Sequence, residues 1–356
     1  MSLRSRGEGR LYGLDLIRTL AFLAILIFHW SWAVWIDPSG PPNPMPTSLG
    51  ALANTYARAF SFSGFTIVFL SFFLIGYRGS SYRKKNWLPV FFLAGFLLFS
   101  LCTFLKERGF PFTWDIYPLL VVGILSSQFF MKQQRGVRWA LIFISVLLLS
   151  YPVWKLPFTK NIPFLWGEVL FGRCPEDYAD WPLIPWIALI WFGALLGQEL
   201  RLQFAQKLIP MHRWEFVVWI PILVWFFLNR GAYFSTDLGD GWSCFTFRQE
   251  PKVFWAHMLF WMLCIRLAFL PQVQGFLSRR SWIRALSHLQ VNQNFFLAYL
   301  THYLVIFALI GILDPGRNLE PSQICDWVLV LIWPLTELVS RAVLKLTKRQ
   351  KQTVQA

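Results

Sequence analysis

The segment LDLIRTLAFLAILIFHWSWAVW, residues 14–35, decides the fold class of this chain. It is apolar over about the 20 residues that a helix needs to cross a bilayer, yet it contains Asp15, Arg18 and His29. Positions 15, 18, 22, 25 and 29 step by three and four, so they form one stripe on a helix. Arg18 and His29 then point the same way, roughly 16 Å apart along the axis. Ionisable groups at membrane depth usually face a cavity or a partner, so we expect this stripe to line a reaction channel.

The composition of the whole chain is typical of a polytopic membrane protein. Of the 356 residues, 56% are hydrophobic and only 14% are charged, against about 25% charged residues in a soluble domain. Mean hydropathy is +0.48, and there are 20 Trp residues. We therefore predict an all-α protein with a single transmembrane domain over residues 1–356, in contact with membrane lipid. The net charge of +15 is then explained by basic loops at one membrane face, and we predict no nucleic-acid partner.

The apolar segments predict about ten transmembrane helices, with both termini on the same side. Most Lys and Arg residues fall in connections on the N-terminal side, whereas most Asp and Glu residues fall on the opposite side. This asymmetry makes both termini cytoplasmic. The chain has no N-x-Ser/Thr glycosylation site, so we expect a multi-pass protein of the bacterial inner (plasma) membrane. The predicted segments are 14–35, 57–77, 88–105, 112–130, 138–154, 182–199, 214–229, 253–270, 294–313 and 327–346.

The first predicted helix carries the strongest candidates for chemistry. The imidazole of His29 suits a general base near neutral pH, or a transient acyl carrier; a buried, hydrogen-bonded histidine is the alternative. Arg18 and Asp15 lie near the cytoplasmic end. They form either an ion pair or part of an anion site, because a guanidinium suits phosphate well.

A second cluster of cations follows the second predicted helix, in GYRGSSYRKK, residues 76–85. Arg78, Arg83 and Lys84 could hold a phosphate group there, although a cytoplasmic loop has this composition in any case. A cationic mouth fits a nucleotide phosphate, and a channel running inward to His29 fits a long thin arm. Acyl-CoA has both parts, so we expect acetyl-CoA (acyl-CoA) as co-substrate. The five cysteines show no metal-binding spacing, and we predict no metal.

The segment RLYGLDLIRTLAFLAILIFHWSW, residues 10–32, resembles the first-helix signature of membrane acyltransferases, in which Asp-x-x-Arg precedes a histidine. Two families share it: the acyltransferase-3 family and the family of the heparan-alpha-glucosaminide N-acetyltransferase catalytic domain. The stretch DYADWPLIPWIALIWFGALLG, residues 177–197, resembles a motif of the second family. The chain departs at Thr19, where the family usually has glycine. The resemblance implies that His29 is catalytic and that Arg18 supports the coenzyme end.

A further histidine lies in FFLAYLTHYLVIF, residues 295–307, which resembles a late helix of these families with a Tyr-Leu-x-His pattern. His302 is our second catalytic candidate, as a proton relay or a partner of the reacting group, with Tyr299 and Tyr303 near it. A hydrogen-bonded interior histidine is the alternative.

Three residues near the outer end of the sixth predicted helix are candidates for acceptor binding. Asp177 and Tyr178 could hydrogen-bond sugar hydroxyls, and Trp186 could stack on a sugar ring. Solvated loop acids and an interfacial tryptophan are the alternatives.

These observations predict a transmembrane acyltransferase. It would move an acyl group, acetyl by expectation, from cytoplasmic acyl-CoA to an amino or hydroxyl group of a sugar or glycan at the outer face. A polytopic transporter of a small polar or anionic solute is the alternative. The acyl chain length, the acceptor, N- versus O-transfer and the oligomeric state stay open, with a homodimer as one possibility.

Overall fold

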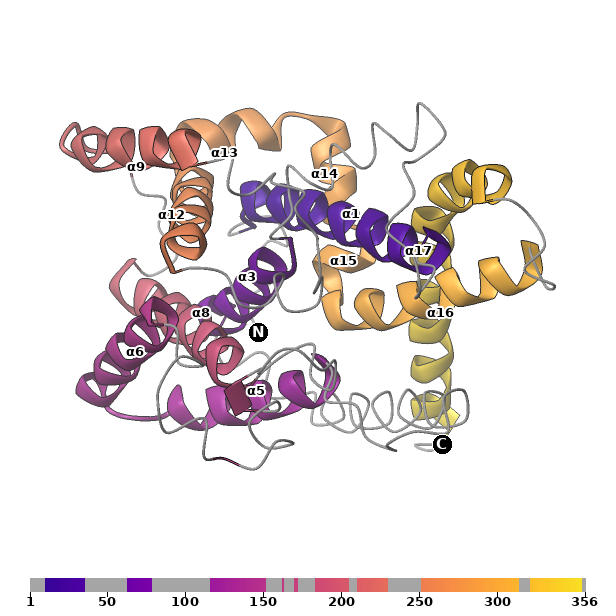
Figure 1. Cartoon of the computed structure of the whole chain (residues 1–356), viewed down its shortest axis with the longest axis horizontal. Coiled ribbons are helices and arrows are strands. Elements are labelled where there is room, and N and C mark those ends of the chain that lie inside the picture. Colours follow the sequence, from indigo (N-terminus) through magenta and orange to yellow (C-terminus); the bar gives the residue numbers. More distant parts are fainter. Residues whose placement is uncertain are drawn as a thin grey trace. The chain divides into compact units, whose positions relative to one another are not determined.

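The computed structural model describes residues 10–35, 63–78, 116–151, 162, 170–171, 183–204, 210–229, 251–313 and 321–353. Figure 1 shows that these residues fold into helices, and no strand occurs among them. The all-α prediction is therefore confirmed for this part of the chain.

The helix bounds agree with the apolar segments of the sequence. Each of the ten predicted ranges overlaps an observed helix, except 88–105, which lies outside the described residues. The helices are α1 (Tyr12–Trp35), α3 (Ser63–Arg78), α5 (Ile116–Phe130), α6 (Arg135–Ser150), α8 (Leu183–Phe204), α9 (Glu215–Asn229), α12 (Pro251–Ala268), α13 (Pro271–Ser278), α14 (Ser281–Ser287), α15 (Gln290–Gln293), α16 (Phe295–Leu313) and α17 (Pro321–Thr353).

The connection 271–293, for which the sequence predicts no helix, forms the three short helices α13, α14 and α15. α13 begins with Pro271, whose missing N–H costs nothing at a helix start. Gln274, Leu277 and Ile283 are buried. This connection is therefore folded against the protein through one face of its helices.

Within the described ranges, no single helix is both long enough and apolar enough to cross a membrane. One bent pair of helices meets both conditions together. The pair is Met258–Ala268 with Pro271–Ser278, bent by 72°.

The chain divides into two compact units. Unit 1 comprises Met1–Ile67 and Cys264–Ala356, and unit 2 comprises Val68–Leu263. In unit 1, α1 contacts every helix from α13 to α17, and α16 packs along α17. The hydroxyls of Thr301 and Ser340 lie 2.5 Å apart across the α16–α17 contact. The first segment of unit 1 is thus enclosed by the last segments of the chain.

Unit 2 is built around α8, which packs on α5 and α6 and meets α3 through glycines. A Cβ atom on Gly197 would lie 2.1 Å from the carbonyl oxygen of Phe73, and one on Gly76 would lie 1.9 Å from that of Ala194. Gly193 meets the carbonyl of Phe69 in the same way, at 2.8 Å. The two helix backbones approach closely because these positions carry no side chain, as in the G-x-x-x-G contacts of membrane helices.

Candidate functional site

The predicted stripe of α1 faces the interior of unit 1. Asp15 is 2% exposed, Arg18 4%, Phe22 2% and Ile25 4%. The stripe is therefore closed by protein from Asp15 to Ile25, and the expected open channel does not run along this part of it. His29 lies on the same helix, but its side chain is outside the described residues.

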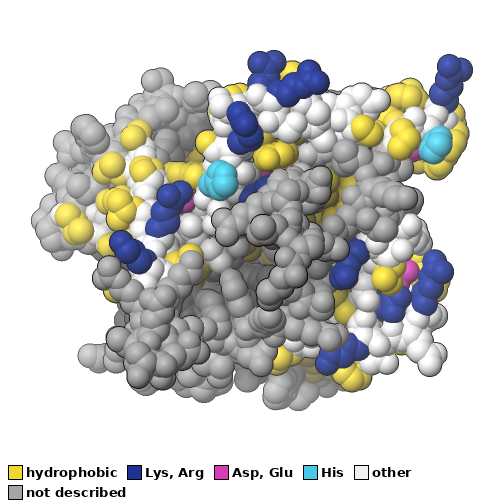
Figure 2. Space-filling view, turned by 180° about the vertical axis from the view of Figure 1, so that it is seen from behind, with side chains coloured by type: hydrophobic (Ala, Val, Ile, Leu, Met, Phe, Trp, Pro, Cys, Tyr) yellow, Lys and Arg dark blue, Asp and Glu magenta, His cyan; other side chains and the backbone are white. Residues whose placement is uncertain are grey.

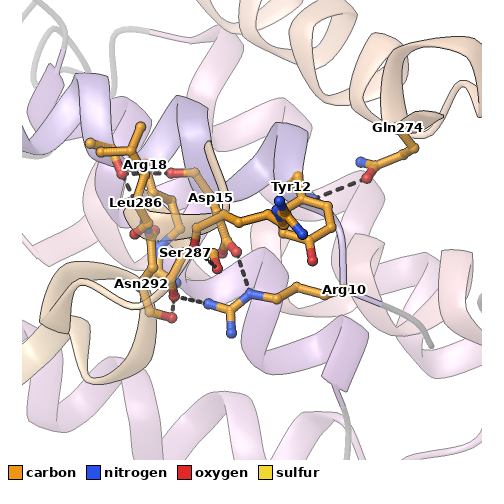
Figure 3. Close-up of polar contacts among 10 residues, drawn as sticks. Arg10, Tyr12, Asp15, Arg18, Gln274, Leu286, Ser287 and Asn292 are labelled. Carbon is orange, nitrogen blue, oxygen red and sulfur yellow. Dashed lines mark hydrogen bonds and ion pairs between the residues drawn. The ribbon is translucent and has the colours of Figure 1, made fainter. Parts of the chain in front are cut away.

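The carboxylate of Asp15 is held by an arginine that sequence reasoning did not single out. Arg10 Nε donates to Asp15 Oδ2 at 2.6 Å, and Arg10 also donates to the backbone carbonyl of Ser287. The backbone N–H of Tyr12 donates to Gln274 Oε1 at 3.1 Å. Figure 3 shows these side chains converging on the start of α1. The helix start is thereby fixed to α13 and to the end of α14.

Arg18 contacts the start of α16. Its guanidinium carbon lies 5.4 Å from the centre of the Phe295 ring. One of its terminal nitrogens donates to the carbonyl oxygen of Asn292 at 3.4 Å. The ring face carries partial negative charge, so it stabilises the buried cation. The buried guanidinium is therefore enclosed by a ring face and a backbone carbonyl.

Thr19 uses its hydroxyl where the family resemblance leads one to expect glycine. Its Oγ1 donates to the carbonyl of Asp15 at 2.8 Å and accepts from Asn292 Nδ2 at 2.8 Å. The same amide group of Asn292 donates to the carbonyl of Leu286 at 2.9 Å. Asn292 is 1% exposed, and within the described ranges its Oδ1 atom has no hydrogen-bond partner. Thr19 and Asn292 together close the polar part of the stripe.

An aromatic cluster continues the stripe from Arg18 to His302. Phe22 makes edge contacts with Phe295, His302 and Trp333, at centroid distances of 6.1, 5.8 and 5.9 Å. Arg18, Phe295, Phe22 and His302 thus form an unbroken series of contacts. Two predicted site residues from opposite ends of the chain are thereby brought into one cluster.

His302 is completely buried, at 0% exposure. Its Nδ1 atom contacts the carbonyl oxygen of Tyr299, and the ring of Tyr303 lies 4.3 Å away between centroids. A carbonyl can only accept a hydrogen bond, so Nδ1 is the donor in this contact.

For most of the other predicted site residues, the structure describes no side chain. Arg78 ends α3 in unit 2, and its side chain is not described. Arg83, Lys84, Asp177 and Tyr178 lie outside the described residues.

Trp186 is in α8 and is 1% exposed in the core of unit 2. Stacking on a sugar requires an open ring face. In this structure Trp186 therefore serves as a core residue of unit 2.

The cluster also contains polar residues that sequence reasoning missed. For one of them, Asn292, the sequence holds a signal: the run of amides QVNQN at residues 290–294, directly before the apolar segment of α16. Within the described ranges, no group of three or more His, Cys, Asp or Glu could hold a metal ion. The missed residues are Arg10, Gln274, Ser287 and Asn292.

Comparison of the chain with family models, curated proteins and solved structures gave no match.

Proposed function

We propose that the chain is a multi-pass membrane acyltransferase. It transfers an acyl group, in the first instance acetyl, from cytoplasmic acyl-CoA to an amino or hydroxyl group of a sugar or glycan at the outer face. The observation that carries the proposal is the contact series from Arg18 through Phe295 and Phe22 to His302. Arg18 and Phe22 lie on the same stripe of α1 as His29. His29 is about two turns, or 10 Å, beyond Phe22 along the helix.

The outward-facing side chains support a membrane location. In α6 the polar residues Arg138 and Ser145 are buried, whereas Phe143 is 62% exposed. In α9, Val217 and Leu228 are 75% and 79% exposed. A water-soluble helix has the opposite pattern, with its apolar stripe inward. Apolar side chains directed outward are what a lipid environment favours.

Ion pairs and hydrogen bonds support the proposed topology within each unit. In unit 2, Arg138 at the start of α6 pairs with Glu199 near the end of α8, at 2.6 Å. In unit 1, Glu337 accepts a hydrogen bond from the backbone N–H of Gln290 at 2.8 Å. Arg138, Glu199, Gln290 and Glu337 all fall on the side that the charge distribution assigns to the cytoplasm. Their contacts agree with that assignment.

The chemistry needs a base and a place for the coenzyme. In the direct mechanism, His29 takes the proton of the acceptor while the acceptor's oxygen or nitrogen attacks the thioester carbon. The carbon–sulfur bond then breaks, and coenzyme A leaves as the thiolate. In the carrier mechanism, His29 itself is acylated first. His302, behind Phe22, serves as proton relay. Arg18, with Arg78, Arg83 and Lys84, supplies positive charge for the coenzyme phosphates.

The buried stripe determines how the substrates approach. Because α1 is closed by protein from Asp15 to Ile25, acyl-CoA reaches His29 only after this contact opens, or by a path that avoids it. If this contact opens, the guanidinium of Arg18 can exchange the Phe295 ring for a phosphate.

The decisive experiment measures acetyl-CoA binding and release of free coenzyme A in the purified full chain. We compare wild type, His29→Ala and His288→Ala, in which the control histidine is exposed on the surface of unit 1. With an amino sugar present, wild type and His288→Ala release coenzyme A. His29→Ala binds acetyl-CoA, but its turnover is slower by at least on the order of 100-fold. General acid–base catalysis contributes at least that factor.

The kinetic order then separates the two mechanisms, because an acylated His29 predicts ping-pong kinetics. If the wild-type protein binds neither acetyl-CoA nor a longer acyl-CoA, the proposal is wrong, and the transporter becomes the hypothesis to test.

A further inference from the structure

The helices α13 and α14 present a basic and aromatic surface on the outside of unit 1. Phe276 and Trp282 are each 57% exposed, and Arg279, Arg280 and Arg284 are exposed between and beside them. We call these five residues the basic aromatic surface. Figure 2 shows basic side chains next to exposed hydrophobic ones on the described part of the molecule.

The orientation of the basic aromatic surface is fixed from within. Gln274 and Leu277 of α13 and Ile283 of α14 are buried on the opposite face. Gln274 also donates to the carbonyl of Ala268 at 2.6 Å and accepts from the backbone of Tyr12. The arginines and aromatics therefore point outward because the inner face is held by packing and hydrogen bonds.

A hollow of about 660 Å³ lies within this surface. The guanidinium carbon of Arg280 lies 4.8 Å from the centre of the Phe276 ring. Residues 264–313 contain no Asp or Glu, so this segment offers the arginines no acidic partner. The hollow is lined by Pro271, Gln272, Gly275, Phe276, Arg279 and Arg280.

The direction of α13 relative to α12 suits a membrane surface. The two helices meet at a bend of 72°. If α12 crosses the bilayer, a helix bent by that angle runs nearly along its surface. Arginine and tryptophan are the residues that gather at the headgroup level.

We infer that the basic aromatic surface binds the phosphate headgroups of anionic phospholipids at the cytoplasmic face of the membrane. Trp282 and Phe276 lie at the boundary between headgroups and acyl chains, and Arg279, Arg280 and Arg284 contact the phosphates. A phospholipid suits this surface because it supplies acyl chains to the exposed rings as well as a phosphate to the arginines. The inference rests on the membrane location in the proposed function, but not on the acyl-transfer reaction.

The test counts bound lipid by native mass spectrometry on the full chain in detergent, with phosphatidylglycerol or phosphatidylcholine of the same acyl chains. Wild type is compared with the double variant Arg279→Gln/Arg280→Gln. The control is Lys132→Gln/Lys345→Gln, which removes the same charge at two exposed positions. We expect the first variant to lose affinity for phosphatidylglycerol by on the order of tenfold or more, at about 1 kcal/mol per arginine. The control keeps wild-type affinity.

Two further measurements make the outcome unambiguous. All four residues are exposed, so the melting temperatures of both variants should equal that of wild type. Equal binding of the two lipids by wild type overturns the inference, as does equal loss in both variants. It is also overturned if 3′-phosphoadenosine nucleotides displace phosphatidylglycerol one for one, because the surface is then a nucleotide site. If wild type binds phosphatidylglycerol selectively but releases no coenzyme A, the lipid site stands and the acyltransferase proposal fails.

Discussion

The guanidinium of Arg18 lies over the ring of Phe295, with 5.4 Å between its central carbon and the ring centre. Arg18 is on α1 and Phe295 begins α16, so this contact joins a helix at the start of the chain to one near its end. Since Arg18 is 4% exposed, the ring replaces solvent around the cation.

Phe295→Leu should therefore destabilise the protein. The substitution keeps an apolar side chain but removes the ring face, and a desolvated cation–π contact contributes about 2 kcal/mol. We expect a lower melting temperature. Phe276→Leu is the matched control, because Phe276 also lies under an arginine, Arg280, but at the surface. Equal melting temperatures for the two variants would show that the buried Arg18–Phe295 contact stabilises the protein no more than the surface Arg280–Phe276 contact does.

Asn292→Ala should lower the free energy of unfolding by about 1–3 kcal/mol. The substitution leaves the buried hydroxyl of Thr19 and the carbonyl of Leu286 without their hydrogen-bond donor. Gln293→Ala, at the neighbouring exposed position, changes an amide of similar chemistry at no such cost. Thermal unfolding of both variants measures the difference. Indistinguishable curves would mean that water satisfies the polar groups around Asn292.

Gly197→Ala should disrupt the contact of α8 with α3. The added Cβ atom would lie 2.1 Å from the carbonyl oxygen of Phe73, so the two helices must move apart. We expect the free energy of unfolding to fall by about 1–3 kcal/mol or more. Gly136→Ala is the control, since a Cβ there meets nothing within 4 Å. A fall in melting temperature for Gly197→Ala alone confirms the close approach. Full tolerance of this substitution would rule it out.

Glu199→Gln should destabilise unit 2 strongly. The carboxylate pairs with Arg138 at 2.6 Å and with Arg135 at 3.4 Å, and Arg138 is itself buried. Removing one partner of a buried pair costs about 3–5 kcal/mol, because the other charge stays buried and uncompensated. Arg138→Met/Glu199→Leu removes both charges and should recover most of the loss. A double variant no better than Glu199→Gln would contradict this explanation.

The sequence predicted the longer helices because each overlaps an apolar segment, and burial against other helices does not change that pattern. It missed α13, α14 and α15 because short helices in a polar connection have too few residues to show a period. Their stability comes from the buried faces of Gln274 and Ile283. These faces are buried by packing on α1, a tertiary contact that the local sequence does not predict.

The candidate site was predicted in part. The spacing of Asp15, Arg18 and Phe22 predicts one shared helix face, because helix geometry fixes which residues share a face. That this face is buried, and does not line an open channel, is known only from the structure. Which residues meet that stripe depends on tertiary structure, so the partners Arg10 and Asn292 could not be inferred. Trp186 shows the same limit: a tryptophan near a helix start suits both an interface and a core, and here it is in the core.

The hydrogen bonds of Arg10 to Ser287 and of Arg18 to Asn292 connect residues 277 and 274 positions apart. The ribosome makes α1 first and these partners much later. During synthesis, Arg18 on the nascent first helix therefore lacks the Asn292 carbonyl and the Phe295 ring that later enclose it. A fragment ending before residue 287 lacks those contacts permanently, so proper assembly of α1 depends on completion of the chain.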